Sequence, residues 1–133
     1  MEDLKEIVID TNFFMIPFQF NVDIFAELKI ALSGYKLITP QFVIDELVGL
    51  KHNNKGKIRK EASLALKIAL NGDVEIINVE LLDDESVDDG LVRISKNKFL
   101  ATNDIQLKNK AKAKNIKVAY LRQKRYIAID GFI

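Results

Sequence analysis

Short apolar runs alternate with longer segments of helical spacing along the whole chain. This alternation favours a parallel sheet with helices on both faces, because each parallel crossover needs a helix between its two strands. We therefore expect a three-layer α/β/α sandwich with a central parallel sheet of about five strands. The expected strands are residues 6–10, 36–39, 74–79, 99–102 and 117–121, with residues 126–129 as a short edge strand.

Five segments between these strands carry apolar residues at helical spacing. Pro40 suits the first turn of the second of these helices, with Thr39 as its N-cap. A polar loop is expected after that helix, at residues 51–56. A chain of 133 residues without a linker predicts one domain over residues 1–133. The expected helices are residues 22–32, 40–50, 58–70, 87–96 and 104–114.

Charge is segregated along the chain, although the formal net charge is only +1. Every charged residue in segment 73–89 is acidic, and every charged residue in segment 108–125 is basic. Segment 51–60 is a second basic run. No cysteine is present, which excludes disulfides, thiolate metal sites and cysteine nucleophiles within this sequence.

No segment has the continuous apolar length of a membrane span. The first six residues are mostly charged and lack the apolar core of a signal peptide. We therefore expect a soluble, cytoplasmic protein that does not associate with a membrane.

Acidic residues follow two of the predicted strands directly. Asp10 ends the run of residues 7–9, and Asp104 follows the strand at 99–102. Carboxyl ends of parallel strands meet at one edge of a sheet, so these acids should lie together. Predicted helices add Glu46 and the pair Asp88 and Asp89.

Such a cluster of carboxylates indicates a hard divalent cation. Two ionised carboxylates about 5 Å apart repel by roughly 3 kcal/mol at an effective dielectric near 20, and a bound cation offsets this repulsion. The ion would activate water and stabilise a phosphate oxyanion. Polar neighbours that would support the acids are Thr11, Asn12, Thr102 and Asn103.

Each acid also has an ordinary structural explanation when it is taken alone. An aspartate after a strand often caps the next helix, and acids in a first helical turn suit the helix dipole. The only histidine, His52, lies in the predicted polar loop, and no phosphate-binding glycine motif is present. The functional interpretation therefore depends on the acids converging in one fold.

Four motifs together resemble the PIN domain family over essentially the whole chain. They are Val8-Ile9-Asp10-Thr11-Asn12, Val43-Ile44-Asp45-Glu46-Leu47, Asp88-Asp89-Gly90-Leu91-Val92 and Ala101-Thr102-Asn103-Asp104. The resemblance implies an α/β/α fold with five parallel strands. It also implies a Mg²⁺- or Mn²⁺-dependent ribonuclease that cuts single-stranded RNA.

By position, the family's acidic quartet falls on Asp10, Glu46, Asp89 and Asp104. Asp89 is preferred for the third position, and the adjacent Asp88 stays open as the alternative. The metal ligands implied are Asp10, Asp104 and one or both members of this pair. Asn12 and Thr102 match the polar positions beside the acids.

The resemblance leaves the biological role open among three readings. The tail and the last motif resemble archaeal relatives of the PIN nuclease that processes small-subunit ribosomal RNA in eukaryotes. One alternative is a VapC-type toxin ribonuclease held by an antitoxin, and another is an RNA-binding module with weak or no catalysis. The implied partners are single-stranded or structured RNA, a second copy of the chain, and a ribosome-assembly factor or an antitoxin. The basic residues expected to contact RNA phosphates are Lys55, Lys57, Arg59, Lys112, Arg122 and Arg125.

Overall fold

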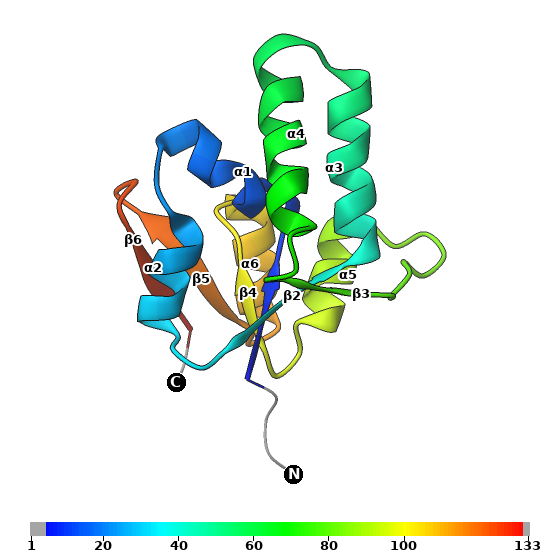
Figure 1. Ribbon diagram of the computed structural model, residues 1–133. Coiled ribbons are helices and arrows are strands. Elements are labelled where there is room, and N and C mark those ends of the chain that lie inside the picture. Colours follow the sequence, from blue (N-terminus) through cyan, green and yellow to red (C-terminus); the bar gives the residue numbers. More distant parts are fainter. Residues whose placement is uncertain (1–4, 132–133) are drawn as a thin grey trace.

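A computed structural model describes residues 5–131 and contains a six-stranded sheet with helices around it (Figure 1). The spatial order of the strands is β3-β2-β1-β4-β5-β6. The first five strands are parallel to their neighbours, and β6 runs antiparallel to β5. This architecture confirms the predicted fold class. The strands are β1 (Glu6–Ile9), β2 (Lys36–Pro40), β3 (Glu75–Ile77), β4 (Phe99–Ala101), β5 (Lys117–Arg122) and β6 (Tyr126–Asp130).

Helices connect the parallel strands in two groups. The group that precedes β3 comprises α1 (Thr11–Phe20), α2 (Ile24–Ala31), α3 (Gln41–Asn53) and α4 (Gly56–Ala69). Within it α1, α3 and α4 contact one another, whereas α5 (Val87–Ile94) packs against α6 (Ile105–Ala113). The strand order reverses between β1 and β4, which places a crevice at the carboxyl ends of these two strands.

The central strands are apolar on both faces because helices cover both. Val8, Ile9 and Leu100 are completely buried, and so are the aromatic rings of Phe13 and Phe14 in α1. Continuous apolar runs of this kind are typical of parallel strands. The well-packed centre of the sheet thus gives a rigid base for side chains at the strand ends.

Helix α1 is an element that sequence patterning did not predict. Pro17 lies inside it, and a proline in a helix interior removes one backbone hydrogen bond and usually breaks the helix. The helix forms because Asp10 caps its N-terminus and because Phe13, Phe14 and Ile16 are buried in the core, where α1 contacts α3 and α4. It ends at Asn21, which adopts a left-handed conformation with φ of 55°.

Helices α3 and α4 form a long antiparallel hairpin that projects beyond the sheet (Figure 1). The predicted loop at 51–56 is wrong in its bounds, because α3 continues to Asn53 and α4 begins at Gly56. His52 therefore lies in the last turn of α3. Thr39 is not the N-cap of α3: Pro40 occupies that position, and the Thr39 hydroxyl donates a 2.8 Å hydrogen bond to the Ile9 carbonyl.

Two lysines of α6 hold the antiparallel strand β6 in place. Lys108 and Lys112 each approach an Asp130 carboxylate oxygen to 3.2 Å, and the Lys108 ammonium also lies 3.6 Å from the centre of the Tyr120 ring. Helix α6 is thereby tied to both strands of the β5–β6 hairpin. Within residues 5–131, no helix has the length and apolar content needed to cross a membrane.

Candidate functional site

A polar pocket of about 260 Å³ opens at the carboxyl edge of the sheet, in the crevice between β1 and β4. Its walls come from the first turns of α1 and α6, from α3 and from α5. Four of the predicted acidic positions contribute to it, each from a different part of the chain. The lining residues are Asp10, Thr11, Asn12, Glu46, Leu50, Val87, Asp88, Leu91 and Asp104.

Asp10 lies at the bottom of this pocket with only 3% of its surface exposed. One carboxylate oxygen accepts a 2.7 Å hydrogen bond from the Phe13 backbone N–H and so caps α1. The other accepts a 2.5 Å hydrogen bond from the Thr102 hydroxyl. Both oxygens are therefore held in fixed directions, which favours a precise binding geometry.

Asp104 occupies the matching position after β4. Its carboxylate accepts a 3.1 Å hydrogen bond from the Leu107 N–H and caps α6, as Asp10 caps α1. Its own backbone N–H donates to the Thr102 hydroxyl over 3.0 Å. Thr102, which is completely buried, therefore links the two acids through one chain of hydrogen bonds. Both acids therefore cap helices, and a carboxylate that caps a helix can still bind a ligand through its other lone pairs.

The α3 wall contributes Glu46, which is exposed and lies one turn before Leu50. Beside Asp10, the buried Thr11 hydroxyl has no hydrogen-bond partner among the described residues. A buried polar atom without a partner is costly unless a ligand or water satisfies it. The pocket thus combines ionisable oxygens with an unsatisfied hydroxyl.

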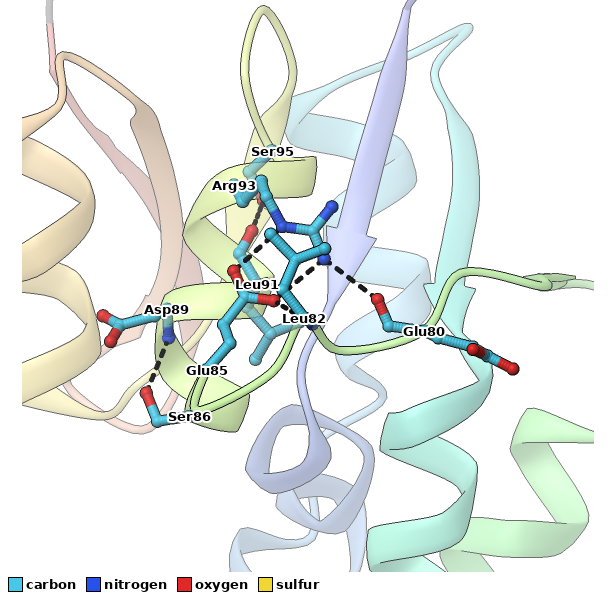
Figure 2. Close-up of polar contacts among 8 residues, drawn as sticks. All are labelled: Glu80, Leu82, Glu85, Ser86, Asp89, Leu91, Arg93 and Ser95. Atoms are coloured by element: carbon cyan, nitrogen blue, oxygen red, sulfur yellow. Dashed lines mark hydrogen bonds and ion pairs between the residues drawn. The ribbon is translucent and has the colours of Figure 1, made fainter.

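The two adjacent acids of α5 point in different directions, Asp88 toward the pocket and Asp89 toward Lys110. This arrangement favours Asp88 over Asp89 for the third position of the acidic quartet. Asp88 is half-buried and lines the pocket beside Val87 and Leu91. Asp89 is exposed and lies outside the pocket lining, with its carboxylate 3.2 Å from the Lys110 ammonium of α6. Figure 2 shows the Asp89 side chain pointing away from the Arg93 network. The preference for Asp89 therefore does not agree with where the two side chains lie.

The loop before α5 is attached to that helix by Arg93 (Figure 2). The guanidinium donates two hydrogen bonds of 2.9 Å to the Glu85 carboxylate and one of 3.0 Å to the Glu80 carbonyl. Bidentate pairs of this kind fix geometry as well as charge. Gly90 then allows close packing, because an added Cβ would lie 2.4 Å from Leu81 and 3.2 Å from the Phe42 ring of α3.

Burial and neighbouring acids disfavour the ionised form of two pocket carboxyls. Desolvation raises the pKa of Asp10 to about 7, and the charges of Asp104 and Glu46 act in the same direction. Burial, followed by the charge of Asp104, also raises the pKa of Asp88. By contrast, hydrogen bonds from Lys110 and Ser86 lower the pKa of Asp89. Lys110 thus pairs directly with Asp89, whereas its charge only partly offsets the effect of burial on Asp88.

The donor set of the pocket fits a hard divalent cation. Carboxylate, hydroxyl and amide oxygens are the ligands that such ions prefer. The pKa of Asp10 is raised mainly by burial and further by the charges of Asp104 and Glu46, so a bound cation would favour its ionised form. Within residues 5–131 no three acidic or histidine side chains stand close enough together to surround an ion by themselves.

The raised pKa of Asp10 predicts how stability depends on pH without added metal. The folded state binds a proton with a pKa of about 7 instead of 3.8, so it holds more protons than the unfolded chain between these values. The contribution of Asp10 to stability is then greatest below about pH 4, declines by about 4 kcal/mol as pH rises from about 4 to 7, and stays constant at higher pH. Urea denaturation in EDTA should show this decline, and Asp10→Asn should flatten it. A wild-type profile that rises over this range would contradict the assignment.

The six basic residues expected to contact RNA fall into three places. Lys55, Lys57 and Arg59 lie at the start of α4, at the end of the α3–α4 hairpin. Arg122 and Arg125 flank the turn between β5 and β6. Lys112 lies in the last turn of α6 and pairs with Asp130, so it is placed away from the pocket.

The supporting polar residues do not all act as expected. Asn103 does not hold a pocket carboxylate: its side chain pairs with the Leu121 backbone, accepting from the N–H over 2.7 Å and donating to the carbonyl over 3.1 Å. Asn12 is exposed and lines the pocket. The sequence analysis did not predict Leu50 and Val87 as wall residues. Leu50 lies one helical turn after Glu46 and Val87 one turn before Leu91, so helical spacing indicates that each pair shares a face.

Comparison with known proteins gives a consistent result over nearly the whole chain. Residues 7–124 match the family model of the PIN-like domain. Ribonuclease VapC4 of Methanocaldococcus jannaschii is 31% identical over 138 residues, covering 98% of this chain and all of that protein. Ribonuclease VapC9 of Archaeoglobus fulgidus is 30% identical over 126 residues, covering 92% of this chain and 87% of that protein.

The fold also has a counterpart among solved structures. The structure of the PIN domain endonuclease Utp24 superposes with a TM-score of 0.79 and covers 99% of this chain and 96% of that one. The two sequences are 23% identical. This likeness supports the arrangement of strands and helices that brings the acids to one edge of the sheet.

Proposed function

Because the chain belongs to the PIN-like domain family, we propose that it is a Mg²⁺- or Mn²⁺-dependent endoribonuclease that cuts single-stranded RNA. The observation that carries this proposal is the pocket shared by Asp10, Glu46, Asp88 and Asp104. Relatives of similar length are named ribonucleases, and PIN nucleases generally use divalent metals. A divalent ion bound among these carboxylates would activate water for hydrolysis of a phosphodiester.

The pocket residues divide into two roles in this proposal. Asp10 and Asp104 hold the ion, because helix caps fix both carboxylates at the strand ends. Glu46 and Asp88 orient water from the α3 and α5 walls. When bound, the ion activates water and stabilises the charge that develops on the phosphate. Thr11 and Asn12 offer further polar contacts beside Asp10.

The direct test is a cleavage assay on a labelled RNA with single-stranded loops. Cuts are expected in Mn²⁺ and in Mg²⁺, and EDTA should abolish them. Asp104→Asn serves as the inactive control, and its circular dichroism should match that of the wild type. Binding of the RNA without any cleavage by the wild-type protein in either metal would replace this function with that of an RNA-binding module.

The curated relatives favour one regulatory role as a second candidate. Two of them carry the name VapC and match over most of their own length. In this role the same chemistry is restrained by a small protein partner, and expression of the chain alone arrests growth. An Asp104→Asn variant should relieve the arrest. Normal growth with an active enzyme would instead favour ribosomal RNA processing.

A further inference from the structure

Two basic hairpins stand on either side of the acidic pocket. The α3–α4 tip, residues 51–60, contains only basic charges: Lys51, His52, Lys55, Lys57, Arg59 and Lys60. The β5–β6 turn, residues 122–125, contains Arg122, Lys124 and Arg125. Figure 1 shows both at the end of the molecule where β1 leads into α1. The pocket acids lie at this same end.

The α3–α4 tip continues directly from the pocket wall. Glu46 and Leu50 of α3 line the pocket, and α3 ends three residues after Leu50 at Asn53. With a rise of about 1.5 Å per residue, the basic tip begins within one helical turn of the pocket. The first cation of the tip, Lys51, directly follows the pocket-lining residue Leu50.

Asn103 places the β5–β6 turn at the opposite side. Its side chain makes two hydrogen bonds to the Leu121 backbone, so Arg122 follows immediately beside this contact. In the sequence, Asn103 directly precedes Asp104, which lines the pocket. The position of the basic turn is thus coupled to that of an acid at the candidate metal site.

The backbone of the β5–β6 turn is unusual for its sequence. Gln123 and Lys124 have φ of 54° and 56°, which corresponds to a type I′ turn that normally favours Asn-Gly. Left-handed conformations are costly for such residues and often persist where they serve a function. The result is a tight turn with exposed, positively charged side chains. In the part of the chain from 5 to 131, none of the six ion pairs uses a cation of the tip or the turn.

Exposed aromatic rings lie beside the β5–β6 turn. The Lys124 ammonium is 5.3 Å from the centre of the Phe20 ring at the end of α1, and the turn leads directly into Tyr126. Phe20 and Tyr126 are 39% and 40% exposed. Unpaired bases stack on such rings, whereas paired bases in a duplex are not available for stacking.

We propose that the α3–α4 tip and the β5–β6 turn form the two sides of a track that carries single-stranded RNA across the acidic pocket. This proposal rests on the proposed function and adds the path of the substrate. Phosphates contact the basic side chains of both hairpins, and bases stack on Phe20 and Tyr126. A strand held on both sides presents an internal phosphate to the acids, so a circular single-stranded RNA should be cut.

Binding of a labelled single-stranded RNA of about 12 nucleotides tests the track. Fluorescence anisotropy is measured with full-length protein carrying Asp104→Asn, which prevents cleavage, in EDTA and in Mn²⁺. One variant carries Lys55→Gln, Lys57→Gln and Arg59→Gln, and another carries Arg122→Gln, Lys124→Gln and Arg125→Gln. Each should weaken binding by about 10-fold or more and reduce the salt slope by about 2.

A matched control removes three cations at the other end of the molecule. Lys29→Gln, Lys96→Gln and Lys114→Gln affect exposed residues at or after the C-termini of α2, α5 and α6. This variant has the same net charge as the other two and should bind like the parent protein. Equal losses of RNA affinity in all three variants would mean that net charge alone explains the effect. Unchanged RNA affinity in the two hairpin variants would overturn the track.

The aromatic contacts have their own readout. Tyr126→Val keeps a residue that suits a strand, and it should reduce the preference for single-stranded RNA over a duplex of the same length by about 5-fold or more. If this preference for single-stranded RNA is unchanged, bases do not stack on Tyr126 and that part of the proposal is wrong. Failure of the proposed function can be distinguished from failure of the track. If the wild-type protein does not cleave RNA, the ribonuclease proposal fails, but the binding results still test the track. Conversely, cleavage with unaltered binding by both hairpin variants overturns only the track.

Discussion

Asp10→Asn is expected to reduce RNA cleavage by about 10³-fold or more while leaving the fold intact. Asn keeps one oxygen that can accept from the Phe13 N–H, so the cap of α1 survives. The substitution removes the charge of the most deeply buried acid in the pocket. Cleavage rates should be measured at saturating metal and over a series of Mn²⁺ concentrations.

The fold control for this variant is its free energy of unfolding in EDTA at about pH 8. It should equal or exceed that of the wild type, because the variant no longer carries a buried carboxylate whose pKa is raised to about 7. A loss of activity with a matching loss of stability would indicate misfolding. Full activity of the variant would remove Asp10 from the catalytic site.

A second large effect should distinguish two adjacent residues. Asp88→Asn is expected to lower cleavage by about 10²-fold or more, whereas Asp89→Asn should change it by less than about threefold. The reason is their position, since Asp88 lines the pocket and Asp89 pairs with Lys110 at the surface. Single-turnover rates for both variants under identical conditions give the comparison.

These two variants are matched in chemistry and in sequence position. Both replace an aspartate in the first turn of α5, so their effects on the helix dipole are similar. Asp89→Asn also breaks an exposed ion pair, which is worth at most about 1 kcal/mol. The opposite order of activities would return the third acidic position to Asp89.

Fold class and strand positions were predictable because they depend on local patterns. The apolar runs that precede Asp10 and Asp104 are short and buried, and such runs are typical of parallel strands. Helix α1 was not predictable by the same reasoning, since Pro17 opposes a helix locally. Burial of Phe13 and Phe14 overrides that local preference, and burial is a tertiary effect.

Some residues of the candidate site were also predictable from the sequence, and others were not. Asp10 and Asp104 follow from strand ends, where the direction of the chain fixes where an acid lies. The choice between Asp88 and Asp89 depends on helix phase, since adjacent residues are rotated by about 100° around a helix. Close packing of Gly90 against Leu81 and Phe42 sets that phase. The Gln123-Lys124 turn could not be anticipated, because its sequence lacks the usual glycine signal.

The double duty of Asp10 and Asp104 as helix caps has a consequence for dynamics. Their carboxylates accept hydrogen bonds from the Phe13 and Leu107 amides, so a fraying first turn of α1 or α6 also displaces an oxygen of the pocket. An ion that holds these carboxylates should slow the opening of both turns. Hydrogen–deuterium exchange at these two amides therefore reports occupancy of the pocket, independently of any RNA substrate.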